Sequence, residues 1–301
     1  MKKKLLIIGF GSSGRKFANI AKKKFKKLEV FILTRQKKIG FNTINEISDI
    51  KSINPQFIII CSPTALHFDQ LKKINSLFKN KRILIEKPLF DKFKKIKNNN
   101  KVFVGYNLRI LKIVKFVKSF IRKNKNNIYD IYFINHSYLP HWRKNINYQN
   151  SSSAKRKFGG GVILDCSHEI DLVRWMMGEV KILKVFKSKN SKLKIETEDN
   201  CKVFAKNKKS NIIIDLNYYS LSKKRKILIS GHNFNLRADL VNSEVIIVKK
   251  NKKIIKKFNK KEIQESYFKE LEGLIINKNQ NLTNYHSAIL TQKLINKIQD
   301  F

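Results

Sequence analysis

The chain has 301 residues, 42% of them hydrophobic, with 65 Lys and Arg against 22 Asp and Glu and a formal net charge of +43. This length and apolar content are typical of two modest globular domains. Cys61, Cys166 and Cys201 are too few and too scattered for a disulfide framework or a zinc site, and no apolar run is long enough to span a bilayer. We therefore expect a cytoplasmic protein that binds no metal and no membrane.

The positive charge alone would suggest nucleic acid as a partner. However, the excess is nearly all lysine, it is spread over every segment, and it comes with abundant asparagine and isoleucine. That pattern indicates a composition bias of the source genome, whereas a nucleic-acid surface would cluster arginine with aromatic residues. We expect no specific nucleic-acid binding and interpret residues 22–27 and 249–257 as solvated faces and loops.

The first segment predicts a dinucleotide-binding arrangement. A buried strand at 4–8 is followed by the loop Gly9-Phe10-Gly11-Ser12-Ser13-Gly14, which opens a helix that continues to about Lys24. In this arrangement Gly9 permits a tight turn, Gly11 lets the backbone approach a pyrophosphate, and Gly14 lets helix and strand pack closely. The alternative is an ordinary glycine-rich turn.

A second strand at 30–33 ends in Thr34 and Arg35. An enzyme that selects NAD usually has Asp or Glu here, about 20 residues beyond the glycines, to bind the ribose hydroxyls. Since Arg35 can bind a 2′-phosphate through its guanidinium fork, the sequence favours NADP over NAD. The alternatives are that Arg35 stacks on adenine or is simply exposed to solvent.

The next strands, at 57–60, 82–85 and 102–104, complete the predicted parallel sheet. Ligands bind at the carboxyl edge of such sheets, so we expect the residues that follow these strands to lie beside the cofactor. Pro88 fixes the direction of Lys87 and permits a cis bond, and His67 is expected to be structural. The residues of interest at this edge are Ser62, Pro63, Thr64, Glu86, Lys87, Asn107 and Arg109.

Beyond residue 110 the pattern changes to a helix at 111–121, strand-like segments and two helices from about 267 to 301. Successive strands indicate a mostly antiparallel open sheet in an α+β domain. We therefore predict an α/β dinucleotide-binding Rossmann domain at 1–110 and a substrate-binding and oligomerisation domain at 111–301. The predicted strands of the second domain are 128–138, 180–189, 201–205, 211–219, 225–230 and 245–249.

A glycine run, Gly159 to Gly161, leads through a short apolar stretch to Asp165 and His168. Ser167 is the predicted N-cap of a helix and Gly178 its C-terminal glycine, which places His168 in the first helical turn. The positive end of the helix dipole disfavours imidazolium there, so we expect a neutral imidazole that can accept a proton. The alternative is that Asp165 caps the helix and His168 is a packed side chain.

Taken in order, these motifs resemble the family of oxidoreductases named after glucose-fructose oxidoreductase and inositol dehydrogenase. The segment from Tyr138 to Arg143 with the glycine run also resembles members associated with sugars of surface polysaccharides. The resemblance covers nearly the whole chain and rests on Gly9–Gly14, Ser62–His67, Glu86–Pro88, Gly105–Arg109 and Gly159–Trp175.

The resemblance implies a nicotinamide cofactor on the first domain, bound by residues 9–14, Thr34, Arg35, 62–64, Glu86 and Lys87, and a carbohydrate or sugar derivative as substrate. Lys87 matches the family's lysine that hydrogen-bonds the reacting oxygen, His168 its general acid or base, and Asp165 its nearby carboxylate. Such a set fits hydride transfer, in which the oxygen gains or loses a proton. Substrate contacts are expected from Tyr138, Trp142 and Arg143, and from Asn107 and Arg109, for which the alternative is support of the lysine loop.

One departure concerns spacing, because many members have the carboxylate four residues before the histidine and here Asp165 precedes His168 by three. Both spacings place two side chains on one helical face. Two alternatives remain open: a cofactor-binding sensor without turnover, and chemistry in which bound NAD is recycled during glycoside hydrolysis or elimination. An open sheet face is usually covered by a second subunit, so we expect a homo-oligomer, a dimer or tetramer.

Overall fold

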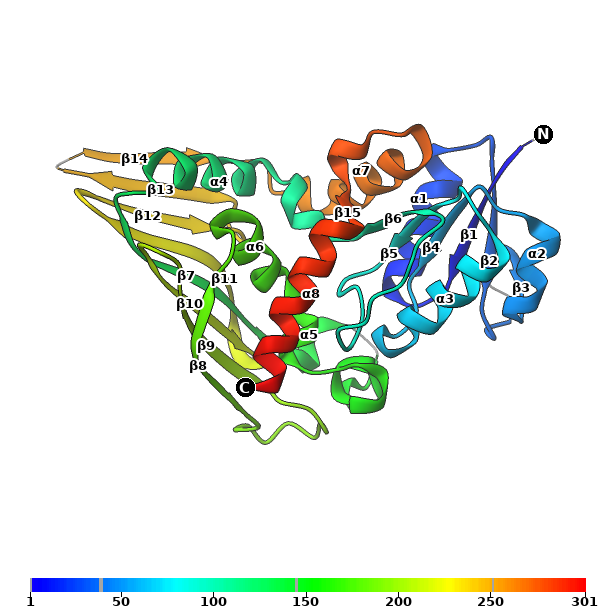
Figure 1. Cartoon of the computed structure of the whole chain (residues 1–301), viewed down its shortest axis with the longest axis horizontal. Coiled ribbons are helices and arrows are strands. Elements are labelled where there is room, and N and C mark those ends of the chain that lie inside the picture. The colour runs from blue at the N-terminus through cyan, green and yellow to red at the C-terminus, as the bar shows by residue number, and fades with distance from the viewer. Residues whose placement is uncertain (1, 38–39, 144–145, 251) are drawn as a thin grey trace. The chain divides into compact units, whose positions relative to one another are not determined.

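The computed structural model describes residues 2–37, 40–143, 146–250 and 252–301, and the chain forms two compact units (Figure 1). The first comprises Met1–Asn107 and Gln264–Gln292, and the second Leu108–Ile263 and Lys293–Phe301. The boundary expected at 110/111 would give residues 264–292 to the second domain. They belong instead with the first unit, because Leu271 and Leu274 are buried in its core.

The first unit is built on a seven-stranded sheet in the order β15-β6-β5-β4-β1-β2-β3. Every pairing is parallel except that of β15 with β6. The order β3-β2-β1-β4-β5-β6 is that of a dinucleotide-binding fold, as predicted. The strands are β1 (Lys3–Ile8), β2 (Leu28–Leu33), β3 (Asn42–Ile44), β4 (Phe57–Ile60), β5 (Arg82–Ile85), β6 (Lys101–Val104) and β15 (Thr283–Asn284).

Helices cover both faces of this sheet because alternate residues of its strands point to opposite sides. Leu5 and Ile7 are in one core cluster with Phe17 of α1, and Leu6 and Ile8 are in another with Leu71 of α3. Figure 1 shows α1 and α3 against the strands. The helices that contribute to the unit are α1 (Ser12–Lys24), α2 (Ile50–Ile53), α3 (His67–Leu77), α7 (Glu262–Ile276) and the first part of α8 (Tyr285–Asp300).

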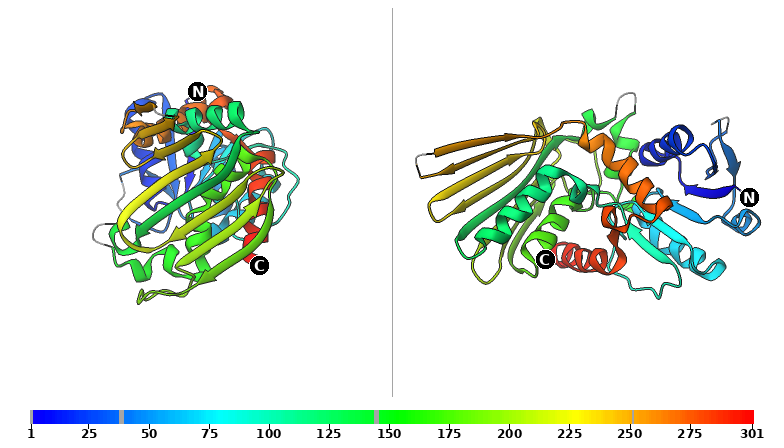
Figure 2. Two further views of the ribbon diagram at one scale, coloured as in Figure 1. Left: turned by 90° about the vertical axis from the view of Figure 1, so that its left-hand side faces the viewer. Right: turned by 90° about the horizontal axis from the view of Figure 1, so that it is seen from above.

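The second unit is built on an eight-stranded sheet in the order β14-β13-β12-β11-β7-β10-β9-β8, seen nearly face-on in Figure 2, left. Its neighbours pair antiparallel except β7 with β10, so the mostly antiparallel sheet is confirmed. The strands are β7 (Ile128–Tyr138), β8 (Lys181–Ser188), β9 (Asn200–Lys206), β10 (Asn211–Asn217), β11 (Tyr219–Gly231), β12 (Phe234–Asp239), β13 (Glu244–Lys249) and β14 (Lys252–Lys257). The sequence did not predict β12, and it predicted loop or solvated face where β14 forms an exposed edge strand.

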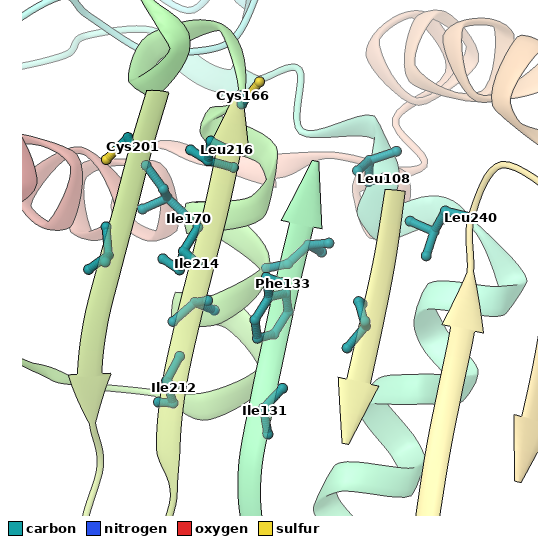
Figure 3. Close-up of a cluster of buried hydrophobic side chains, with 14 of the residues drawn as sticks. Leu108, Ile131, Phe133, Cys166, Ile170, Cys201, Ile212, Ile214, Leu216 and Leu240 are labelled. Carbon is teal, nitrogen blue, oxygen red and sulfur yellow. The ribbon is translucent and has the colours of Figure 1, made fainter. Parts of the chain in front are cut away.

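One face of this sheet packs on the helices α4 (Lys112–Asn124), α5 (Val162–Asp165) and α6 (Ser167–Met177). Figure 3 shows Phe133 of β7 and Ile212 and Ile214 of β10 in this core with Ile170 of α6. The opposite face carries large apolar side chains that are exposed, among them Tyr132 and Phe204. None of the helices in the described parts of the chain is long and apolar enough to cross a membrane.

Candidate active site

The glycine loop after β1 is shaped by close backbone contacts. Gly9 has φ of +92°, and a Cβ there would lie 2.8 Å from the backbone nitrogen of Ser62. A Cβ on Gly14 would lie 2.1 Å from the carbonyl oxygen of Gly9, whereas one on Gly11 would meet no atom within 4 Å. The loop therefore needs glycine at 9 and 14 for packing and leaves open space at Gly11, which fits the approach of a diphosphate.

Helix α1 starts directly behind this open space. Its N-cap is Gly11, no side chain caps the helix, and its first turn carries no acidic residue. The amide groups of the first turn and the dipole favour an anion at such an end. Ser12 is exposed there, while Phe10 is only 8% exposed and packs edge-on against Phe41.

The loop after β2 carries one exposed guanidinium group, Arg35, and lies close to the glycine loop and to the exposed Arg15 of α1. Arg35 is exposed, and the hydroxyl of Thr34 accepts a hydrogen bond from the amide of Gln36 at 3.2 Å. Arg15 of α1 donates to the side chain of Gln36 at 3.1 Å and lies over the ring of Phe10. No acidic residue occurs between 34 and 37, so this loop presents cations where NAD-selective folds present a carboxylate.

The loop after β4 lies against the glycine loop. The Ser62 hydroxyl donates to the side-chain oxygen of Gln70 at 2.6 Å, and Pro63 and Thr64 are half-buried. His67 begins α3 and is 1% exposed, in agreement with its expected structural role. Burial lowers the pKa of His67, although three backbone carbonyl groups around its ring oppose that shift.

The loop after β5 carries Glu86 and Lys87, both half-buried. The Lys87–Pro88 bond is cis, as the sequence allowed. The Glu86 carboxylate accepts a hydrogen bond from the Lys87 amide at 3.2 Å, and Ser13 bonds to the same carboxyl group. Burial raises the pKa of Glu86, while Lys87 and Ser13 act in the opposite direction.

Helix α7 places a second carboxyl group behind Glu86. Glu270 is 2% exposed, and a Cβ at Gly105 would contact the oxygens of both Glu86 and Glu270 at 3.6 and 3.7 Å. Burial raises the pKa of Glu270 well above its usual value, and Glu86 adds to that rise. The same helix holds Asn107, whose amide donates to the hydroxyl of Ser266 at 2.9 Å. The first unit thus brings the loops of residues 9–14, 62–64 and 86–88 together at one edge of its sheet.

In the second unit the glycine run is explained by the chain's own atoms. A Cβ at Gly160 would lie 2.3 Å from the Ser152 carbonyl oxygen, and one at Gly161 would lie 2.3 Å from the Glu198 carboxylate. Gly161 also has φ of +115°. Glycine is therefore needed at 160 and 161 so that the backbone of residues 152–153 and the Glu198 carboxylate can pack against the run.

Asp165 and His168 lie on two short helices and not on one. Asp165 ends α5, Cys166 breaks the helical backbone with ψ of +23°, and α6 begins at Ser167. Ser167 is therefore the first helical residue, and its predicted role as N-cap is wrong; Gly178 does end the helix, with φ of +78°. The assumption of one common helical face is wrong for the same reason. Both Asp165 and His168 are half-buried.

Asp165 accepts a hydrogen bond of 2.6 Å from the hydroxyl of Tyr218, a fully buried side chain that the sequence did not single out. Burial, followed by the charge of Asp165, raises the pKa of Tyr218 well above its usual value. Glu198, also missed, accepts from the Ile163 amide at 3.2 Å, and its pKa is raised by burial and by Asp165. The signal for Glu198 was a cluster of acidic residues at 196–199 just before a strand.

The predicted sugar-binding segment lies partly beside Asp165. The Trp142 indole is 38% exposed, donates to the Ser137 hydroxyl at 3.0 Å, and meets the ring of Tyr218 edge-on at 5.2 Å. Tyr138 packs edge-on against His141 instead. Trp142 and Arg143 line a hollow of about 10 Å³, which has room for about one water molecule and not for a sugar.

Arg109 has an internal partner in the second unit. Its guanidinium binds the carboxylate of Asp171 in a fork, with contacts of 2.8 and 2.5 Å, and lies over the ring of Trp175. Asp171 is 1% exposed, so this charge is neutralised inside the unit. The geometry indicates a structural role, and contact of Arg109 with substrate stays a prediction.

Two models of one protein family match the chain. Residues 3–110 match the oxidoreductase family with an NAD-binding Rossmann fold, and residues 124–234 match the GFO/IDH/MocA C-terminal domain. The chain belongs to the GFO/IDH/MocA family. It is therefore an oxidoreductase whose first unit is the family's NAD-binding domain, and the resemblance noted in the sequence is confirmed.

Solved structures share the fold over the whole chain. The WlbA dehydrogenase from Bordetella pertussis, in complex with NADH and UDP-GlcNAcA, is 16% identical with a TM-score of 0.78, covering 100% of this chain and 96% of that one. A putative NADPH-dependent oxidoreductase from Desulfitobacterium hafniense is 14% identical with a TM-score of 0.79, covering 99% and 96%.

A third similar structure is the UDP-N-acetylglucosamine 3-dehydrogenase GnnA from Acidithiobacillus ferrooxidans. It is 12% identical with a TM-score of 0.75, covering 100% of this chain and 97% of that one. At these identities the likeness of this GFO/IDH/MocA chain to the solved structures shows the fold alone. No curated protein sequence matches the chain.

Proposed function

We propose that this oxidoreductase is an NADP- or NAD-dependent dehydrogenase or reductase that acts on a CH–OH group of a carbohydrate, an activated sugar used for surface polysaccharides. The observation that carries the proposal is the open space at Gly11 in front of the uncapped α1, next to the loop that bears Lys87. Support for the substrate class comes from WlbA, whose structure contains UDP-GlcNAcA, and from GnnA, which is named for UDP-N-acetylglucosamine.

The bound nicotinamide would supply or accept the hydride. Lys87 would donate a hydrogen bond to the reacting oxygen and stabilise negative charge there, because an ammonium group is a strong point charge in a half-buried site. His168 would accept the hydroxyl proton in oxidation and return it in reduction. Asp165, fixed by Tyr218, would orient or balance the charge of that histidine.

The test is direct. Purified protein should bind NADPH or NADH by calorimetry, and turnover should be screened with UDP-linked sugars and their acids. Lys87→Ala should abolish turnover and leave cofactor affinity nearly unchanged, whereas Lys101→Ala, at the amino end of β6, should change neither. Absence of cofactor binding would overturn the proposal. Cofactor binding without any turnover would favour the sensor alternative.

We also propose that the protein is a cytoplasmic homo-oligomer that associates through the open face of its second sheet. Tyr132, Ile213 and Phe204 form one row on that face, since they are paired across β7, β10 and β9. Tyr132 is 39% exposed and Phe204 40% exposed, so burial of the row against a second copy would remove apolar surface from water. Sedimentation of wild type and Phe204→Glu tests this, and an equal mass for both would contradict it.

A further inference from the structure

His67 lies between two loops of the first unit and touches the backbone of both. Its Nδ1 atom is 3.1 Å from the carbonyl oxygen of Pro88 and 3.3 Å from that of Leu89. Its Nε2 atom is 3.0 Å from the carbonyl oxygen of Ser62. The side chain is 1% exposed, so no solvent replaces these contacts.

All three partners of this imidazole are carbonyl oxygens, which only accept hydrogen bonds. A neutral imidazole has one N–H and donates to the carbonyl groups of one loop, while a ring protonated on both nitrogens donates to both loops; an apolar side chain of similar size would leave all three buried carbonyl groups without a donor. The contacts serve no helix cap, because α3 begins at His67 without a side-chain capping bond. The polar ring is therefore used to join the two loops.

The two loops leave the sheet side by side. Ile60 and Ile85 are paired at the ends of β4 and β5, and the amide of Glu86 donates to the carbonyl of Ile60 at 2.9 Å. Beyond Ile60 and Ile85 the two backbones are no longer paired as strands, and the His67 ring contacts both of them. The Pro88 carbonyl that it binds belongs to the residue directly after Lys87, so the ring restrains the backbone that carries the lysine.

We propose that His67 is a positioning residue for Lys87: it ties the lysine-bearing loop to the Ser62 loop and thereby sets where the ammonium group meets the reacting oxygen. This inference rests on the function proposed above for Lys87. A misplacement of about 1 Å can cost on the order of 100-fold in rate, so loss of the link should lower turnover far more than it lowers cofactor affinity.

Three substitutions separate the two contacts. The amide nitrogen of Asn falls near the Nδ1 position and that of Gln near the Nε2 position, so His67→Asn retains a donor for Pro88 and His67→Gln retains one for Ser62. We expect kcat to fall about 10- to 100-fold in His67→Ala and His67→Gln. His67→Asn should recover most of that loss, and the Kd for cofactor should change less than about 3-fold in all three.

Asn100→Ala is the matched control. Asn100 is also buried in the first unit, and its amide donates to the carbonyl of Phe78 at 3.0 Å and to Asn75 at 2.8 Å, but it lies by the amino ends of the strands. It should lower thermal stability about as much as His67→Ala and leave kcat unchanged. Equal loss of kcat in the two variants would show that His67 contributes only stability and would overturn the proposal.

Amide hydrogen exchange tests the link without turnover. His67→Ala should speed exchange at residues 86–91, whereas Asn100→Ala should not. Unchanged exchange in His67→Ala would overturn the proposal even in an active enzyme. If the wild type binds cofactor but turns over no sugar, the proposed function fails while faster exchange still supports the link, so the two failures are distinguishable.

Discussion

The glycine loop yields a pair of substitutions with opposite effects. In Gly14→Ala the new Cβ would lie 2.1 Å from the carbonyl oxygen of Gly9, a backbone atom, so helix and loop must separate by about 1 Å. Overpacking of this kind costs up to about 3 kcal/mol, and alanine in a helix returns about 1 kcal/mol. The net loss of about 2 kcal/mol should lower the Tm by roughly 8 °C at about 4 °C per kcal/mol for a domain of this size.

In Gly11→Ala the new Cβ meets no protein atom within 4 Å. Stability should fall by only about 0.5–1 kcal/mol, the usual difference between Gly and Ala at an N-cap. The methyl group would instead occupy the space in front of α1, and we expect the Kd for NADPH to rise at least 10-fold. Thermal melts and calorimetry on both variants check this. Unaltered cofactor affinity in Gly11→Ala, or unaltered stability in Gly14→Ala, would refute the reasoning.

Three further predictions concern the charge of Arg35, the buried carboxyl group of Glu270, and the contact of Arg82 with residues 273–274. Arg35→Ser should raise the Kd for NADPH about 10- to 100-fold, because a charge-assisted contact is lost, and should change the Kd for NADH less than about 2-fold. Equal changes in titrations with the two cofactors would show that Arg35 does not select between them. Burial raises the pKa of Glu270 in the folded protein, whereas in the unfolded chain the carboxyl group has its ordinary pKa of 4.5. Above pH 4.5 the folded protein therefore keeps a proton that the unfolded chain releases, and the free energy of unfolding of wild type falls as the pH rises. Glu270→Gln should therefore match wild type near pH 4 and melt higher at pH 8, and parallel Tm curves would contradict this. Arg82→Ala removes the donors to the carbonyl groups of Gly273 and Leu274, at 2.9 and 2.6 Å, and should lower the free energy of unfolding by about 2–4 kcal/mol. Urea unfolding measures this, and an unchanged unfolding midpoint would contradict it.

Strands with a continuous or alternating pattern of buried apolar residues were predictable to the residue. Phe57–Ile60, Arg82–Ile85 and Ile128–Tyr138 form as expected, because burial on one or both faces leaves a clear pattern. Strand β14 was missed since all its residues are exposed and only its pairing with β13 makes it a strand. Local sequence carries little information about such a pairing.

The positions of the candidate residues were predictable where a motif and a strand end coincide, as for the glycine loop after β1 and Lys87 after β5. The break at Cys166 between α5 and α6 was not, because neither proline nor glycine marks it. Tyr218 and Glu198 also escaped notice, since their importance arises from contacts with Asp165 and Gly161, more than 30 residues away in the chain. Contacts of that range depend on the sheet register, which composition and periodicity leave undetermined.

The return of residues 264–292 to the first unit has a consequence for synthesis. During translation the glycine loop, the lysine loop and the entire second sheet exist before β15 and most of α7 are made. Until then the edge of β6 lacks its antiparallel partner, and Arg82 lacks the carbonyl groups that it will bind. The nascent cofactor domain must therefore be kept from pairing its open edge with other chains until residues 264–292 emerge from the ribosome.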